Sequence, residues 1–236
     1  MAIKLYMVQG SHPCAAVAKG MEMKGLSFKV FEYPPPMHSF VQKLRFGKRT
    51  VPSLRMDGEK VSGTIPILHR LDELVPEPRL FTENPGVATA AEWGVEDFQQ
   101  VPRDLLWAGL AHKPTALWSF AQNSRLRLPK PMVVASAPLI IFPTRAINKT
   151  NDAKARRRLS ELPAMLDKVD AWIADGTIGD TAHPNAADLS LLSTVRLLST
   201  IGDVRPLLDG RPCDSAARTL WPVWDGNLPA GIFASS

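Results

Sequence analysis

Four residues near the N-terminus have the types and spacing of a thiol-handling site. Ser11, His12, Pro13 and Cys14 lie between an expected strand, residues 3–8, and an expected helix. The N-terminus of a helix carries a partial positive charge, which favours a thiolate of the protein or of a bound thiol. A serine hydroxyl there would donate a hydrogen bond to that sulfur and so stabilise the thiolate. The alternative is that Ser11 only caps the helix.

Cys14 has the position of the second cysteine in a Cys-x-x-Cys pair whose first cysteine is replaced by serine. The low-pKa attacking cysteine of a thiol reductase is therefore absent. Small apolar residues follow at Ala15, Ala16 and Val17, which favours a Cys14 that packs the helix against a sheet. A reductase that uses Cys14 is the least favoured of three functional hypotheses.

A second candidate segment begins at Val51-Pro52. Proline offers no N–H to a sheet, so a proline at the mouth of a strand suits a site where the preceding residue presents its backbone to a ligand. We expect this bond to be cis, and Val51 to face an open pocket. Further along, Gly63-Thr64 opens a helix, and a hydroxyl with free N–H groups at that position suits a carboxylate.

The elements that must position these residues alternate over the first 80 positions. Strands are expected at residues 3–8, 27–33, 50–56 and 60–61, and helices at 14–24, 40–45 and 65–74. The order βαβ, an irregular helix, then ββα predicts a four-stranded mixed sheet with helices on both faces. This α/β domain spans residues 1–78, and Pro76 and Pro78 mark a linker.

From residue 85 onward helical spacing replaces the strand pattern, which predicts an all-helical domain over residues 85–236. One helix starts with Asn84 as cap and Pro85 at its first position. Another covers residues 152–174, where leucine, valine and isoleucine recur every three or four positions. Asn185 and Asp188 form a variant of the capping box before an apolar run.

Together these segments resemble the cytosolic, serine-type glutathione transferases, in which a thioredoxin-like domain precedes an all-helical domain. The resemblance is close over residues 2–80 and looser over residues 85–210. It implies that Ser11 activates the thiol of glutathione for transfer to a small hydrophobic electrophile, a detoxification reaction that needs no metal. It further implies a homodimer in which the α/β half of one subunit contacts the helical half of the other.

The same resemblance implies the residues that bind glutathione. They are His38, Arg49, Val51, Pro52, Gly63 and Thr64, with Lys48 as a further candidate for the glycyl carboxylate. Gly63 departs from the family, which usually has glutamate or glutamine there to contact the γ-glutamyl amine. The second functional hypothesis is therefore a non-catalytic binding or scaffolding protein of the same fold, and a thiol other than glutathione also stays open.

Aromatic residues offer further candidates. Some transferase classes use a tyrosine at the end of the first strand, but Tyr6 is one residue away from that position and would point to the other face of the sheet. We therefore expect Tyr6 to be structural. The helical domain would supply the pocket for the hydrophobic substrate, with four candidate wall residues: Trp93, Phe98, Trp107 and Trp118.

Composition narrows the class of protein. The 236 residues carry a net charge of +5, but basic and acidic residues are mixed and no aromatic-interleaved basic motif points to nucleic acid. Two cysteines make no disulfide framework, and the N-terminus lacks a signal-peptide pattern. The longest apolar run, residues 132–142, is too short to span a bilayer. We expect a cytoplasmic protein with neither a nucleic-acid nor a membrane partner.

Overall fold

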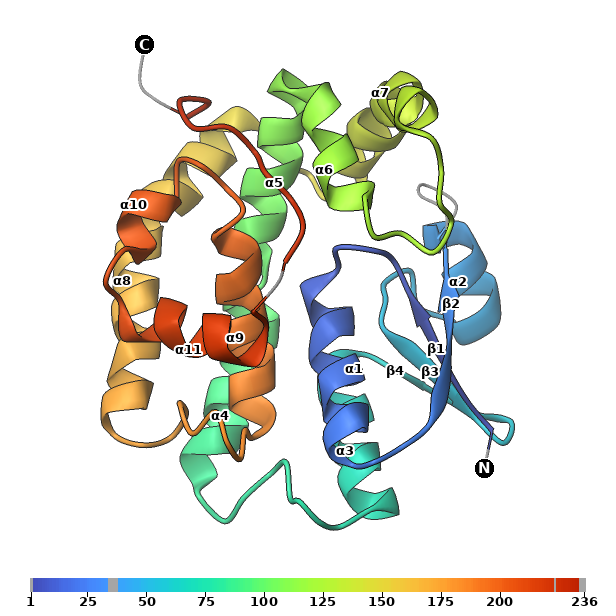
Figure 1. Cartoon of the computed structure of the whole chain (residues 1–236), viewed down its shortest axis with the longest axis vertical. Helices are drawn as coiled ribbons and strands as arrows, with labels where there is room; N and C mark the ends of the chain where they lie inside the picture. Colours follow the sequence, from blue (N-terminus) through green and yellow to red (C-terminus); the bar gives the residue numbers. More distant parts are fainter. Residues whose placement is uncertain (1, 34–37, 223, 234–236) are drawn as a thin grey trace.

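The computed structural model describes residues 2–33, 38–222 and 224–233. Its N-terminal part is built on a four-stranded mixed sheet of order β2-β1-β3-β4, as the alternating pattern predicted (Figure 1). β1 runs parallel to β2 and antiparallel to β3, which pairs with β4 as a hairpin. The strands are β1 (Ile3–Met7), β2 (Phe28–Glu32), β3 (Ser53–Met56) and β4 (Glu59–Ser62).

Three helices complete the α/β domain: α1 (His12–Met23), α2 (His38–Phe46) and α3 (Thr64–Leu74). α1 and α3 pack against each other on the side of the sheet that faces the helical domain, and α2 lies on the other side (Figure 1). α1 begins two residues earlier than expected, directly after Ser11. β3 begins three residues later than expected, because Pro52 cannot donate to the ladder.

The second domain is mostly helical in its described residues, and its non-helical tail forms one isolated bridge, between Leu228 and Ile201 (Figure 1). Both helices expected there are confirmed, since one starts at Pro85 and the other spans Asp152–Ala174. The elements are α4 (Pro85–Trp93), a π-helical turn (Gly94–Phe98), α5 (Gln100–His112), a 3₁₀ turn (Pro114–Ala116), α6 (Leu117–Ala121), α7 (Lys130–Ile147), α8 (Asp152–Ala174), α9 (Ala186–Leu198), α10 (Arg205–Leu208) and α11 (Pro212–Leu220).

Helix α9 is the centre of the molecule, because every one of its residues is buried and it packs against α1, α4 and α11. The predicted capping box starts it. The Asn185 side chain accepts hydrogen bonds from the N–H groups of Ala187 and Asp188, and the Asp188 carboxylate accepts one from the N–H of Asn185 at 2.9 Å. The contact between α9 and α1 joins the two domains.

The π-helical turn lets α4 and α5 pass very close to α9. A Cβ atom on Gly94 would overlap Ser190 Oγ and lie 2.9 Å from a Leu191 methyl group. A larger residue would therefore require the side chains of Ser190 and Leu191 to move.

In the described parts of the chain, no helix combines the length and apolarity needed to cross a membrane.

Candidate functional site

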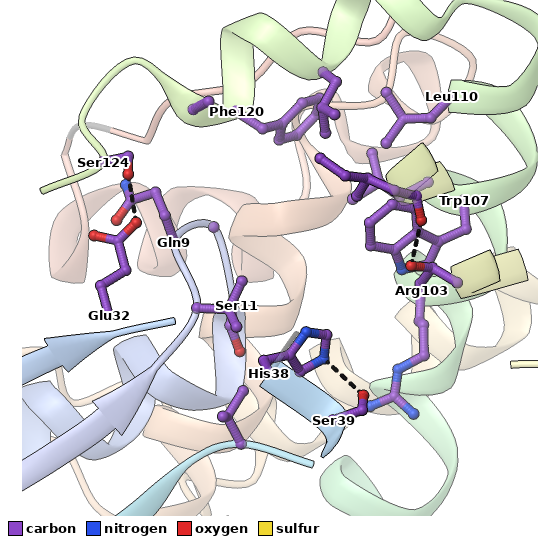
Figure 2. A pocket seen from close by; sticks show the side chains of 18 of the residues that line it. Gln9, Ser11, Glu32, His38, Ser39, Arg103, Trp107, Leu110, Phe120 and Ser124 are labelled. Carbon is purple, nitrogen blue, oxygen red and sulfur yellow. Dashed lines mark hydrogen bonds between the residues drawn. The ribbon is translucent and has the colours of Figure 1, made fainter. Parts of the chain in front are cut away.

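A cavity of about 300 Å³ lies between the α/β domain and the helical domain (Figure 2). Its floor comes from the loop between β1 and α1, from the end of β2, from the start of α2 and from the loop between α2 and β3. Its walls and roof come from α5, α6, the loop after α6, and α7. The predicted residues Ser11, His38, Arg49 and Val51 line it together.

Ser11 is the residue that precedes α1, with extended backbone angles (φ −79°, ψ 111°). Its side chain makes no capping hydrogen bond to the helix, so the hydroxyl is not used as a cap. The side chain projects into the cavity (Figure 2). A thiol bound there would meet both this hydroxyl and the positive end of α1.

Cys14 is fully buried in the first turn of α1. Burial raises the pKa of its thiol to about 11, and the neighbouring Ser11 hydroxyl offsets this only in part. The thiol is therefore protonated at neutral pH and packs as a small apolar side chain. This agrees with the packing role predicted for it and argues against a reductase mechanism.

Tyr6 is also buried, and it lies away from the cavity in a cluster of aromatic rings. Its ring centroid is 5.4 Å from that of Phe31, 5.9 Å from that of Tyr33 and 5.0 Å from that of Phe46. The ring stabilises the sheet against α2, as expected for a structural residue.

The Val51-Pro52 bond is cis, as predicted, and the N–H and C=O of Val51 have no hydrogen-bond partner among the described residues. Pro52 is buried behind Val51. Gly63 is tied to it, because the Gly63 N–H donates to the Pro52 carbonyl at 3.0 Å. Gly63 and Thr64 start α3 but do not line the cavity, and the Thr64 side chain is buried.

Gln42, which the sequence analysis missed, holds this loop in place. Its buried side-chain amide donates to the Thr50 carbonyl at 3.2 Å and to Ser53 Oγ at 3.0 Å, and its oxygen accepts from the Tyr33 hydroxyl. Ser53 Oγ in turn pairs with Ser62 Oγ at 2.8 Å. This network fixes both ends of the segment that presents Val51.

Two histidines place polar nitrogens at the cavity without partners. His12 is 5% exposed, and its Nε2 has no hydrogen-bond partner in the described structure. Burial, and secondarily the charge of Arg103, lower the pKa of His12 to about 3, so the ring is neutral at physiological pH. Burial also lowers the pKa of His38, whose Nε2 pairs with Ser39 Oγ at 3.2 Å while Nδ1 has no described partner.

Arg103 on α5 is the cation that sequence reasoning missed. Its guanidinium extends from the helical domain toward Ser39 (Figure 2), and it donates to Gln100 Oε1 at 2.8 Å. No carboxylate pairs with it among the described residues. Burial lowers the pKa of Arg103, although the group stays protonated at neutral pH.

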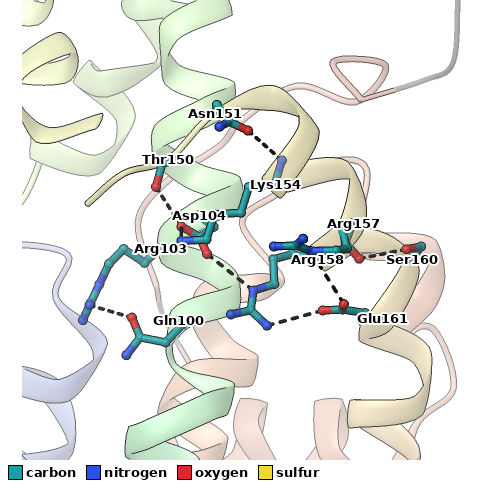
Figure 3. Close-up of polar contacts among 10 residues, drawn as sticks. All are labelled: Gln100, Arg103, Asp104, Thr150, Asn151, Lys154, Arg157, Arg158, Ser160 and Glu161. Atoms are coloured by element: carbon teal, nitrogen blue, oxygen red, sulfur yellow. Dashed lines mark hydrogen bonds and ion pairs between the residues drawn. The ribbon is translucent and has the colours of Figure 1, made fainter. Parts of the chain in front are cut away.

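The neighbouring carboxylate is directed elsewhere. Asp104 is buried and accepts hydrogen bonds from Thr150 Oγ1 at 2.7 Å and Lys154 Nζ at 2.9 Å, with Arg158 Nε at 3.5 Å (Figure 3). The adjacent residues Arg103 and Asp104 therefore point to opposite sides of α5. The consequence is a cation that faces the cavity with no carboxylate in direct contact among the described residues, although the nearby charge of Asp104 partly offsets the effect of burial on the pKa of Arg103.

The walls of the cavity are mostly apolar. Of the four aromatic candidates, only Trp107 lines it, and Trp93 and Phe98 instead stack on each other at 5.3 Å on the far part of the domain. Trp118 is not a lining residue, whereas its neighbour Phe120 is. The other apolar walls come from Leu106, Leu110, Leu117, Leu126, Leu128, Val133, Ile140 and Ile147.

The loop after α6 closes the cavity against the sheet. Glu32, the last residue of β2, accepts hydrogen bonds from the Ser124 hydroxyl and from the Arg125 N–H, the latter at 2.7 Å (Figure 2). The carboxylate thus connects the α/β domain to the roof. Sequence alone gave no signal for this contact, because 92 residues separate Glu32 from Ser124.

Comparison with known proteins places the fold. Residues 5–79 match the family model described as "Glutathione S-transferase, N-terminal domain". No curated protein matches the chain by sequence.

Several solved structures share the architecture of nearly the whole chain. A glutathione transferase from Populus trichocarpa superposes with a TM-score of 0.59 at 15% identity, covering 92% of this chain and 91% of its own. A glutathione S-transferase from Rhodospirillum rubrum gives 0.60 at 15%, covering 98% of both chains. A theta-class glutathione S-transferase from Xanthomonas axonopodis, solved with glutathione bound, gives 0.56 at 16%, covering 82% and 81%. These similarities establish a common fold.

Proposed function

We propose that this protein, which has the glutathione S-transferase fold and an N-terminal domain of that superfamily, binds glutathione and transfers its thiolate to a hydrophobic electrophile. The observation that carries the proposal is the Ser11 hydroxyl, which is free of a capping role at the N-terminus of α1 and projects into an apolar cavity between the domains. This is a thiol-activating position next to a pocket for an apolar molecule.

The chemistry follows from this geometry. The Ser11 hydroxyl would donate a hydrogen bond to the glutathione sulfur, and the positive end of α1 would favour the anion over the thiol. The thiol proton leaves to solvent. The thiolate then attacks the electrophilic carbon, a C–S bond forms, and the leaving group departs with its electron pair. Holding both reactants in one cavity supplies the proximity that such a reaction needs.

Glutathione would lie along the floor of the cavity. The N–H and C=O of Val51, which lack described protein partners, suit the cysteinyl part of the peptide in the manner of an added strand. His38 and Arg49 line the same region and suit the glycyl carboxylate. Pro52, Gly63 and Thr64 belong to the proposal as the residues that shape the γ-glutamyl end beside it.

Helix α5 gives the second substrate a defined character. Arg103, Leu106, Trp107 and Leu110 are spaced so that they share one face of the helix, and all four line the cavity. A cation in apolar surroundings is costly unless an anion pairs with it. We therefore propose an electrophile with an apolar body and an acidic group, the latter bound by Arg103.

A second candidate function is that of a binding or scaffolding protein with the glutathione transferase fold but without catalytic activity. Gly63 favours it, because this residue has no side chain with which to hold the γ-glutamyl amine and sits at the start of α3 with φ +99°. Both candidates include a homodimer of the arrangement that the family resemblance implies.

The experiment compares wild type with Ser11→Ala, and uses Ser136→Ala as a matched control because Ser136 places another hydroxyl in the cavity wall. Calorimetry measures glutathione binding, and ultraviolet titration of the bound thiol measures its pKa. We expect Ser11→Ala to raise that pKa by about one to two units, since a hydrogen bond to a charged group contributes about 1.5–3 kcal/mol. Turnover of an activated aryl chloride should fall about tenfold or more at neutral pH and recover partly at higher pH.

Ser136→Ala should leave the thiol pKa unchanged. Superimposable titration curves for wild type and Ser11→Ala would reject the catalytic role. Glutathione binding without turnover of any electrophile in wild type, or no glutathione binding at all, would reject the transferase and favour the non-catalytic binding or scaffolding candidate.

A further inference from the structure

The exposed large hydrophobic side chains of the described structure gather in two segments. Residues 38–50 contribute Phe40 and Leu44. Residues 122–150 contribute the other five, which are Leu128, Met132, Leu139, Phe142 and Ile147. We call these two segments together the basic apolar rim. Exposed apolar side chains scattered singly need no explanation, but their concentration in two segments indicates a contact surface.

Helix α7 makes up most of this surface, and it is apolar on all sides. Val133 and Ile140 on its inner side line the cavity, while Leu139 is 72% exposed and Phe142 is 53% exposed on its outer side. A helix that is apolar all round is normally buried. The apolar side chains on the outer side of α7 are therefore exposed where a helix of this composition would normally pack against another surface.

The same two segments hold the positive charge of the protein. They contain nine Lys and Arg residues and no Asp or Glu, which gives them a net charge of +9 in a chain whose total is +5. Apart from Arg145, which pairs with Asp152 at 3.0 Å, these cations form no ion pair with described residues. The nine are Lys43, Arg45, Lys48, Arg49, Arg125, Arg127, Lys130, Arg145 and Lys149.

The two segments border one opening. His38 and Arg49 from the first segment, and Leu128 and Ile147 from the second, all line the same cavity. Leu128 and Ile147 are also exposed to solvent, at 38% and 58%, so they lie at its mouth. Polar and apolar side chains from both segments therefore lie at the entrance through which a ligand reaches Ser11.

We propose that the basic apolar rim docks this protein on an anionic lipid surface. The outer side of α7 would enter the boundary between headgroups and acyl chains, with the exposed Lys130 at the start of the helix positioned to contact phosphate. The flanking cations supply the attraction to negative lipid that a single short apolar helix needs for stable binding. The helix lies on the membrane and does not cross it.

A second copy of the chain fits this surface less well. A two-fold symmetric contact places the same patch on both subunits, so a patch of charge +9 would face its equal. Like charges in contact oppose association. A nucleic acid would satisfy the charge, but it offers nothing to cover Leu139 and Phe142. Anionic lipid satisfies both requirements.

The experiment measures cosedimentation of the full-length protein with vesicles of phosphatidylcholine, alone or mixed with phosphatidylserine. We expect binding only to the mixed vesicles, and weaker binding at high salt because salt screens the attraction. Leu139→Gln/Phe142→Gln should lower the partition coefficient about tenfold or more, since it removes the apolar side chains that enter the lipid. Arg127→Glu/Lys130→Glu should lower it by a similar factor.

The matched control is Arg79→Glu/Arg156→Glu, which changes the net charge equally at two exposed cations outside the rim. It should bind the mixed vesicles nearly as wild type does. Equal losses in the two charge variants would overturn the proposal, because binding would then follow total charge alone. Absence of binding by a folded wild-type protein would also overturn it.

Sedimentation velocity tests the alternative in which a second copy of the chain covers the rim. A dimer that dissociates in Leu139→Gln/Phe142→Gln, together with no vesicle binding, would assign the rim to a second copy and overturn the proposal. Circular dichroism confirms that each variant is folded, which is expected because all six substituted side chains are exposed. None of these outcomes depends on glutathione or on turnover.

Discussion

Replacing His12 by Gln should change how the stability of the protein depends on pH. In the folded state, burial lowers the pKa of His12 from 6.5 to about 3. As pH falls through 6.5, His12 therefore becomes protonated in the unfolded chain but stays neutral in the folded protein. Because the folded pKa is the lower one, His12 has no effect on the unfolding free energy above pH 6.5 and lowers it progressively as pH falls toward 3.

The magnitude follows from the separation of the two pKa values. At about pH 5 the unfolded imidazole is mostly protonated and the folded one is neutral, which costs about 2 kcal/mol of unfolding free energy relative to about pH 8. Asp188 acts in the opposite direction, because burial raises the pKa of its carboxyl to about 6 and folding is then favoured as pH falls toward 3.8. The wild-type profile alone would hide part of the effect.

The assay is therefore a difference between two proteins. Urea unfolding of wild type and His12→Gln, followed by circular dichroism at a series of pH values, gives the two free energies with the contribution of Asp188 common to both. We expect the unfolding free energy of His12→Gln minus that of wild type to be about 2 kcal/mol larger at about pH 5 than at about pH 8. Parallel profiles would refute the buried, neutral His12 on which this reasoning rests.

Three further results are expected. Arg103→Gln should weaken binding or turnover of acidic electrophiles about tenfold or more and leave neutral ones unaffected, since a charged hydrogen bond of about 1.5–3 kcal/mol is lost. Steady-state kinetics with an acidic electrophile and its matched amide measures this difference, and equal losses for the two would contradict anion binding by Arg103. Asn185→Ala should cost about 1 kcal/mol in urea unfolding, because the N–H groups of Ala187 and Asp188 lose their acceptor, and an unchanged midpoint would contradict this. Analytical ultracentrifugation should give twice the chain mass of 25.9 kDa, and a monomer at micromolar concentration would reject the homodimer.

Much of the fold could be predicted because it depends on signals between residues that are close in the sequence. The helix start at Asn84-Pro85 and the capping box at Asn185 depend on residues a few positions apart, and both are found as expected. Boundaries were less accurate, since α1 starts at His12 and the expected start was Cys14. Helix α7 was recognised only as an apolar run, because its internal Pro138 and Pro143 are helix-breaking signals.

Part of the cavity lining could be predicted, where a single turn of the chain creates it. Ser11 and Val51 each sit at an element boundary with a clear signal, and both line the cavity. Arg103 could not be found this way, because its exposure to the cavity depends on Asp104 being taken by partners from α8 and the residues before it. Gln42 was missed for the same reason, since its three partners are brought together only by the folded sheet.

The bridge from Glu32 to the loop after α6 has a consequence for the speed of a catalytic cycle. A conjugate is larger than either reactant, and it must leave past a roof held by the Ser124 hydroxyl and the Arg125 N–H. Where the chemical step is fast, detachment of this loop would set the turnover number, as lid opening does in many enzymes. Bulky products would then dwell longest, and solvent viscosity would slow the steady state while leaving single-turnover bond formation unchanged.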